Sequence, residues 1–223
     1  MQARRRVGDP LPLHNSCAQL LCMGIVPSMP AKDAQTTFHL DATALKVLAH
    51  PLRSRLLSAL RRGGPATATD LAAAFSTNTG ATSYHLRKLE SVGLVADTGE
   101  GEGKRRLWRA ATDAHEWTVS DFAGDEDSQT ALNWLVRDYS RHLGQQLERW
   151  LDVEADWPLA WRDACGMSDQ LVLATAEQAQ ALKTELDQVL ARYRDAGAGL
   201  PDARRLAVYT VAFPLDLDEV PGP

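Results

Sequence analysis

Residues 69–93 read TDLAAAFSTNTGATSYHLRKLESVG, and they predict two short helices joined by a tight turn. Thr69 is a candidate N-cap for a first helix over 70–75, because its hydroxyl can accept a hydrogen bond from a free amide of the first turn. The sequence Ser76-Thr77-Asn78 favours the turn. A second helix is predicted over 79–92, with Gly93 as its C-terminal stop. Its buried face is predicted from apolar residues at helical spacing, Ala81, Leu86, Leu89 and Val92.

Two further helices are predicted upstream of this pair. Asp41 is a suitable N-cap for a helix that reaches about Ala49. His50-Pro51 interrupts it, because the residue before a proline avoids the α region. The next helix runs to about Arg62 on leucines spaced four residues apart, Leu52, Leu56 and Leu60. Gly63-Gly64-Pro65 stops it.

A β-hairpin is predicted directly after Gly93. Residues 94–96 and 106–109 read as strands, and the glycine-rich residues 99–103 read as the loop between them. Three helices followed by a glycine-tipped hairpin are the element order of a winged helix-turn-helix domain. We therefore expect such a domain over 37–111, with residues 99–106 as its wing.

The second helix of the pair has the properties of a DNA-reading helix, which buries one face and presents hydrogen-bonding groups to base edges with the other. Arg87 can form two hydrogen bonds to guanine, and the first amides of the helix, capped by Asn78, can hold a phosphate. The basic wing can reach backbone phosphate or the minor groove. The expected DNA-contacting residues are Asn78, Thr79, Gly80, Ser83, Tyr84, His85, Arg87, Lys88, Lys104, Arg105 and Arg106.

The charge of the chain is divided unevenly along its length. Residues 37–111 hold 11 Lys and Arg against 6 Asp and Glu, which leaves a net charge of +5. Residues 112–223 hold 9 basic against 21 acidic residues, a net charge of −12. The overall charge of −5 therefore hides a basic module that suits a polyanionic partner such as double-stranded DNA.

The acidic half is predicted to be mostly helical. Apolar residues at near-helical spacing predict one long helix over 128–152, and Thr175 with Gln178 resembles a capping box at the start of a helix over 175–196. Residues 170–174 and 206–213 are candidate strands. We expect an α+β, mostly α chain in which the winged domain is followed, over 112–223, by a helical dimerisation domain with a small two-stranded element. The expected dimer contacts are Leu132, Leu135, Tyr139 and Leu143.

The order of these motifs resembles the ArsR-like winged helix-turn-helix regulators over about residues 40–111. The resemblance rests on LKVLAHPLRSRLLSALRRG at 45–63, TDLAAAF at 69–75, TNTGATSYHLRKLESVGLV at 77–95 and GEGKRRLWRA at 101–110. It implies a homodimeric DNA-binding transcription factor, usually a repressor, with C-terminal helical extensions that serve dimerisation.

The chain departs from the metal-sensing members of that family. Those members place paired cysteines in the helix before the recognition helix, or His and carboxylate ligands on a terminal helix. Residues 70–75 of this chain read DLAAAF, its histidines form no i, i+4 pair, and Cys17 and Cys22 lack a zinc spacing. We therefore expect a branch that does not sense metals, with no metal site and no cofactor.

Enzymatic and membrane functions find no support in the sequence. The patterns GxGxxG, GxxxxGK[ST], GxSxG and HExxH do not occur, so we expect that the protein is not an enzyme. No run approaches about 18 apolar residues, so no membrane partner is expected. Three cysteines fit a reducing compartment, and we expect a cytoplasmic protein.

Two alternative functions and the nature of the N-terminus stay open. The winged domain could serve as a protein-interaction module, or the acidic half could hold a small organic effector beside Trp117, Trp134, Trp150, Trp157 and Trp161. Packing in a core or dimer interface would explain the same tryptophans. Residues 1–36 are expected to be a disordered tail or the product of a start codon assigned too early, with Met29 as the alternative start.

Overall fold

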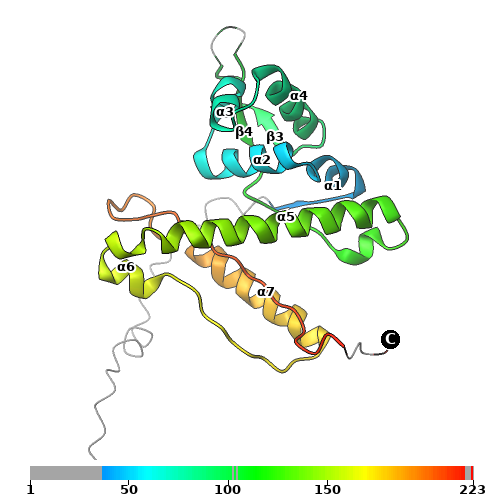
Figure 1. Ribbon diagram of the computed structural model, residues 1–223, viewed down its shortest axis with the longest axis vertical. Helices are drawn as coiled ribbons and strands as arrows, with labels where there is room; N and C mark the ends of the chain where they lie inside the picture. The colour runs from blue at the N-terminus through cyan, green and yellow to red at the C-terminus, as the bar shows by residue number, and fades with distance from the viewer. Residues whose placement is uncertain (1–36, 102, 104, 219–221, 223) are drawn as a thin grey trace, which may run out of the picture. The chain divides into compact units, whose positions relative to one another are not determined.

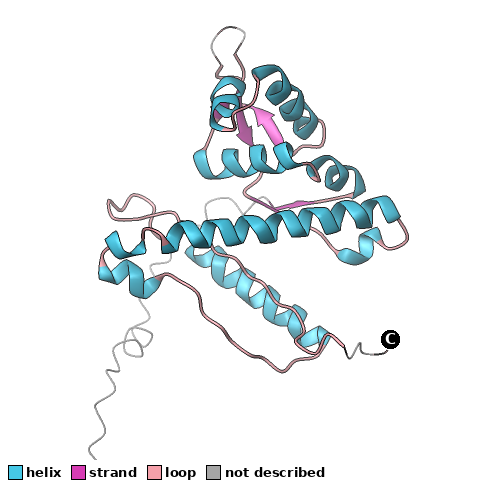
Figure 2. Cartoon of the chain, viewed as in Figure 1, coloured by secondary structure: helices cyan, strands magenta, loops and turns pink. Residues whose placement is uncertain are grey.

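The computed structural model describes residues 37–101, 103, 105–218 and 222 (Figure 1). The predicted tail 1–36 and Lys104 lie outside the described residues. Helices dominate, with short strands between them, as Figure 2 shows. The α+β, mostly α class and the winged helix-turn-helix order are thus confirmed. The first helices are α1 (Ala42–Leu48), α2 (Pro51–Gly63), α3 (Ala68–Ala74) and α4 (Thr79–Glu90).

Local hydrogen bonds explain where α1 and α2 begin and end. Asp41 caps α1 as predicted, because its Oδ1 accepts a hydrogen bond from the Ala44 amide at 2.7 Å. His50 not only ends α1 but also caps α2, since its Nδ1 accepts from the Leu52 amide at 3.1 Å. Pro51 then occupies the first turn, where no amide hydrogen is needed.

The first helix of the pair begins at Ala68, two residues earlier than predicted, and Thr69 is not its cap. Thr67 caps α3 instead: its hydroxyl accepts from the Asp70 amide at 3.2 Å, and Asp70 accepts from the Thr67 amide at 3.1 Å. This reciprocal capping box requires the acidic residue three positions after the cap, a spacing that only Thr67 has. The predicted cap was wrong for this reason.

The turn between α3 and α4 lies where the sequence predicts it. Ser76 adopts a left-handed backbone with φ of 52°, a conformation that usually favours glycine. Its strain is offset by two hydrogen bonds that close the end of α3, from the Thr77 amide to the Ala72 carbonyl at 2.9 Å and from the Ser76 amide to the Ala73 carbonyl at 3.3 Å. Asn78 then caps α4, and its Oδ1 accepts from the Ala81 amide at 2.7 Å.

The hairpin forms one side of a three-stranded sheet of order β2-β4-β3. β3 (Val95–Asp97) and β4 (Leu107–Ala110) are the two predicted strands, each displaced by one residue, and they are antiparallel with Ala96 opposite Arg109. The sequence did not indicate β2 (Ala66–Thr67), nor the parallel pair β1 (Thr37–His39) and β5 (Ala114–Glu116). Strands of two or three residues are too short to show an alternating pattern.

The hydrophobic core extends from the winged domain into the following segment. Fully buried leucines of α1, α2 and α4 pack with Trp108 of β4. The same cluster includes Phe122 of the 3₁₀ helix η1 (Val119–Phe122) and two residues of α5 (Glu126–Leu151), Leu132 and Leu135. The first half of α5 is therefore held by the core of the winged domain.

The remaining chain forms η2 (Glu154–Asp156), α6 (Leu159–Ala164) and α7 (Ala176–Tyr193). α7 begins with the predicted capping box, in which the Thr175 hydroxyl accepts from the Gln178 amide at 3.2 Å. The strands predicted at 170–174 and 206–213 are wrong, because both runs are irregular and exposed. An alternating apolar pattern makes a strand only when a second strand pairs with it, and neither run has such a partner here. No helix among the described residues has the length and apolar character needed to cross a membrane.

Candidate nucleic-acid interface

α4 is amphipathic in the way that a DNA-reading helix requires. Its inner face is formed by Leu86, Leu89 and Thr82, all three of which are fully buried. Thr82 was not foreseen as a buried residue; its hydroxyl donates to the Asn78 carbonyl at 3.1 Å, which satisfies the polar group inside the core. Ala81 and Val92 are only half-buried. The predicted DNA-contacting residues on the opposite face are exposed: Asn78, Thr79, Gly80, Tyr84, Arg87 and Lys88.

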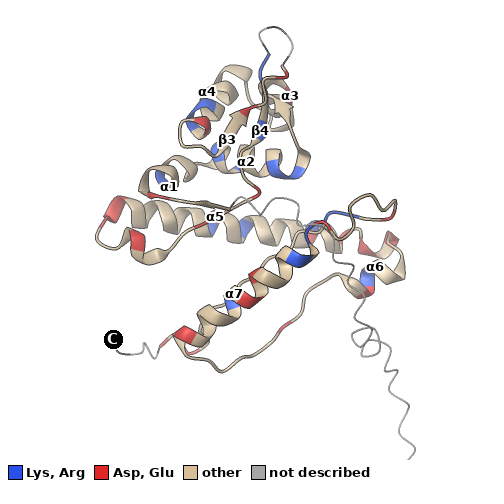
Figure 3. Cartoon of the chain, turned by 180° about the vertical axis from the view of Figure 1, so that it is seen from behind, with Lys and Arg blue, Asp and Glu red and all other residues tan. Residues whose placement is uncertain are grey.

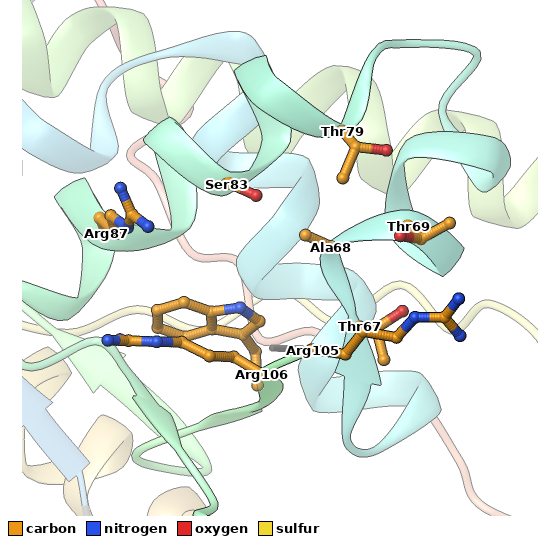
Figure 4. Close-up of a pocket in the computed structure, with 9 residues that line it drawn as sticks. Thr67, Ala68, Thr69, Thr79, Ser83, Arg87, Arg105 and Arg106 are labelled. Atoms are coloured by element: carbon orange, nitrogen blue, oxygen red, sulfur yellow. The ribbon is translucent and has the colours of Figure 1, made fainter. Parts of the chain in front are cut away.

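A polar groove of about 150 Å³ lies between α4, the start of α3 and the base of the wing. Figure 4 shows Thr79, Ser83 and Arg87 lined up along α4 on one side of this groove. Arg105 and Arg106 lie on the other side. The rest of the lining consists of Thr67, Ala68, Thr69 and Trp108. The groove thus combines hydroxyl donors and guanidinium groups, the usual partners of phosphate and base edges.

The two described wing residues of the predicted site have different environments. Arg105 is exposed. Arg106 is engaged within the protein, since its guanidinium lies 3.6 Å from a carboxylate oxygen of Glu90 and 3.4 Å from one of Asp97. It also lies 5.6 Å from the Trp108 ring centroid, a cation–π contact. Arg106 therefore joins the end of α4 to the hairpin, while Arg105 is available to an anionic partner.

His85 occupies a packing position beside the exposed face of α4. Its ring lies 4.5 Å from that of His50 and 5.2 Å from that of Tyr84, measured between centroids. Its Nδ1 is buried and has no hydrogen-bond partner among the described residues. Burial, followed by the nearby His50 and Arg53, lowers the pKa of His85. The ring is thus kept neutral against the N-terminus of α2, so its contribution to the site is to position α4.

Three of the four residues predicted to contact a second copy are used inside the chain. Leu135 is fully buried and Leu132 is 8% exposed, both in the core described above. Tyr139 packs against the same core, and its hydroxyl lies 2.6 Å from His115 Nε2. Leu143 is half-buried. The expectation that Leu132, Leu135 and Tyr139 form a free dimer face is therefore corrected: the apolar stripe of α5 faces the winged domain.

Polar contacts reinforce this attachment of α5 to α2. The Ser54 hydroxyl donates to Asp138 at 2.8 Å, and Arg62 approaches His142 Nε2 at 2.5 Å. Lys46 of α1 pairs with Asp125, the N-cap of α5, at 2.9 Å. The hydrogen bonds from Ser128, followed by this pairing with Lys46, hold the pKa of Asp125 well below its usual range. The recognition helix α4 and helix α5 are consequently both held by α1 and α2.

The tryptophans of the acidic half fall into two groups. Trp117 and Trp134 pack against the main core. Trp150, Trp157 and Trp161 form a separate edge-to-face series with centroid distances of 5.4 and 6.0 Å. Such contacts support the packing interpretation, and an organic effector near these rings stays a prediction. Within residues 37–218, as far as they are described, no three His, Cys, Asp or Glu side chains are grouped to hold a metal ion.

Comparison with protein families agrees with this geometry. Residues 48–98, which run from the end of α1 to just past β3, match a family model described as a helix-turn-helix domain. Comparison with curated proteins gives no match. The match contains α2, α3 and α4, and the general function of the chain is accordingly that of a DNA-binding transcription regulator with a helix-turn-helix domain.

Proposed function

We propose that the protein is an ArsR-like, sequence-specific regulator that inserts α4 into the major groove of DNA. The groove between α4 and the wing carries this proposal, because Thr79, Ser83 and Arg87 line it from α4 and Arg105 lines it from the wing. A B-DNA major groove admits one helix, and hydroxyl and guanidinium groups on that helix suit the base edges it exposes. The basic residues of α2, α4 and the hairpin are marked in Figure 3.

The two sides of the groove have separate roles in this proposal. Arg87 lies in the middle of the exposed face of α4 and reads a base edge, with guanine as its best partner. Arg105, at the base of the wing, neutralises a phosphate or enters the minor groove. Arg106 contributes indirectly, since its ion pairs with Glu90 and Asp97 fix the angle between α4 and the hairpin.

We further propose that the protein acts as a homodimer in the cytoplasm and represses transcription, as the ArsR-like resemblance implies. One winged domain reads only a few base pairs. Two-fold dimers that place their recognition helices about 34 Å apart are the usual solution to this limit. Loss of the protein should then raise transcription of the genes adjoining its operators.

Two arginine variants test the division of roles once operators have been mapped from bound genomic fragments. Arg87→Ala should reduce the free energy of binding to the operator by about 1–3 kcal/mol and relax the sequence preference at one base pair. Arg105→Ala should weaken binding to DNA of every sequence by the same factor. It should also reduce the salt dependence of binding by about one released counterion. Arg162→Ala, on the exposed surface of α6, is the matched control.

Two results would contradict the proposal. Operator binding by Arg87→Ala equal to that of the unmodified protein would remove α4 from the base-reading role. Binding that is indifferent to salt and to sequence in the unmodified protein would favour the alternative of a protein-interaction module, because phosphate contacts make DNA binding strongly salt-dependent.

A further inference from the structure

Tyr84 is the one large hydrophobic side chain that is exposed in the part of 37–111 that the structure describes, and 55% of it is exposed. It is two residues from Thr82 and two from Leu86, both of which are fully buried. Residues two apart lie on about opposite sides of an α-helix, so the ring points away from the core. The side of α4 that enters the major groove in the proposed function therefore carries an aromatic ring among its polar groups.

The surface of α4 beside this ring is open to a partner. Gly80 lies about one turn before Tyr84, on the same side of the helix. A Cβ added at Gly80 would meet the Asn78 Oδ1 at 3.3 Å, and the space around it is otherwise open. Because glycine has no side chain, a base edge can come close to the helix at the position next to the ring.

Two neighbouring side chains hold the Tyr84 ring in place. The His85 ring meets it edge-on, with 5.2 Å between the centroids and 74° between the planes. Lys88 Nζ lies 5.8 Å from the centroid of the Tyr84 ring, a cation–π contact. His85 is itself packed against His50 of α2. A side chain that is already ordered loses less conformational entropy when a partner binds, so the ring is prepared for contact.

The chemistry of the major groove limits what an apolar ring can recognise there. The base edges expose hydrogen-bond donors and acceptors and one apolar substituent, the 5-methyl group of thymine. A ring placed on the polar groups would remove their water without replacing its hydrogen bonds, which costs free energy. A ring placed on the methyl group buries two apolar surfaces against each other, which is favourable.

We propose that Tyr84 recognises a thymine of the operator through contact between its ring and the 5-methyl group. This contact rests on the proposed function of α4 and adds the identity of one base to it. Tyr84 and Arg87 are three residues apart, about 4.5 Å along the helix axis. Successive base pairs of DNA are about 3.4 Å apart. The thymine should therefore lie within about two base pairs of the position whose preference Arg87→Ala relaxes.

Operators in which single thymines are replaced by uracil test this contact, because uracil lacks only the methyl group. Binding of the full-length protein to each operator is measured by fluorescence anisotropy. One replacement near the Arg87 position should weaken binding about fourfold, the effect of leaving one methyl group unburied. Tyr84→Ala should bind the thymine and uracil operators equally, whereas Tyr84→Phe should keep the fourfold difference. Tyr193→Ala, the same change at an exposed tyrosine of α7, is the matched control and should also keep it.

The possible results separate this inference from the proposed function itself. An unmodified protein that binds DNA without sequence preference would overturn both. Specific binding that Arg87→Ala relaxes, but that no uracil replacement weakens, would overturn only the Tyr84 contact. Loss of the fourfold difference in Tyr84→Phe as well as in Tyr84→Ala would assign the contact to the hydroxyl group and overturn the methyl contact. A fourfold difference that persists in Tyr84→Ala would assign the thymine to another residue and overturn the role of Tyr84.

Discussion

Acidification should destabilise this protein through His115, which lies between two groups that require it to be neutral. Arg61 Nη1 lies 2.5 Å from His115 Nδ1, and a guanidinium can only donate, so Nδ1 accepts. The proton of the neutral ring is then on Nε2, which donates to the Tyr139 hydroxyl at 2.6 Å. Burial, with the adjacent Arg61 as the second cause, lowers the pKa of His115 to about 3. In a protonated ring Nδ1 could no longer accept a hydrogen bond from Arg61, and the positive ring would lie beside the positive guanidinium.

The size of the effect follows from the difference between the pKa of His115 in the folded chain and its pKa in the unfolded chain. An exposed histidine in the unfolded chain has a pKa of about 6.5, so only the unfolded state binds this proton between about pH 6.5 and pH 3. The contribution of His115 to the free energy of unfolding is fully present above about pH 6.5. Each pH unit below that value lowers the free energy of unfolding by about 1.4 kcal/mol. The loss reaches about 2 kcal/mol at pH 5, a large part of the stability of a typical domain.

The contribution of His115 can be isolated by comparing pH profiles rather than single values. His115→Asn retains an oxygen that can accept from Arg61 but does not titrate. It should be less stable than the unmodified protein at pH 7.5, by about 1–3 kcal/mol for the lost Tyr139 contact. Between pH 7 and pH 5, however, its free energy of unfolding should fall by about 2 kcal/mol less than that of the unmodified protein.

Urea titrations followed by tryptophan fluorescence at fixed protein concentration provide the measurement. Burial also lowers the pKa values of His50, His85 and His142, so both proteins should lose some stability in acid. His39→Asn is the control, because the His39 ring is about half exposed and bonded to Asp121. Parallel profiles for His115→Asn and the unmodified protein between pH 7 and pH 5 would refute the reasoning.

Three further predictions concern the cap of α3, the attachment of α5 and the absence of a metal. Thr67→Ala should lower the free energy of unfolding by about 1 kcal/mol in thermal denaturation through loss of the capping box, whereas Thr69→Ala should have little effect; the reverse order would restore Thr69 as the cap. Leu135→Ala should destabilise dilute, monomeric protein by about 2–5 kcal/mol in urea, because it opens a cavity in the core; unchanged stability would place Leu135 on a surface. Elemental analysis of the purified protein should find no stoichiometric metal, and operator binding should survive chelation; a bound metal whose removal alters binding would contradict this.

The helices could be read from the sequence because their signals lie within a few residues of one another. Asp41, Asn78 and Thr175 cap their helices as expected, since a cap bonds to an amide two or three residues away. The exposed face of α4 follows from its helical period in the same way. The order of three helices and a hairpin was therefore available from local patterns, together with the basic charge of the segment that contains them.

The partners of each face were decided only by tertiary contacts between distant residues. The spacing of Leu132 and Leu135 shows that α5 has an apolar side, but not that this side packs onto the winged domain. Arg106 reads as one more basic residue of the wing until folding brings Glu90 and Asp97 beside it. The spacing of apolar residues along one helix or strand shows which of its sides is apolar. It does not show which other segment packs against that side, because that segment lies far away in the sequence.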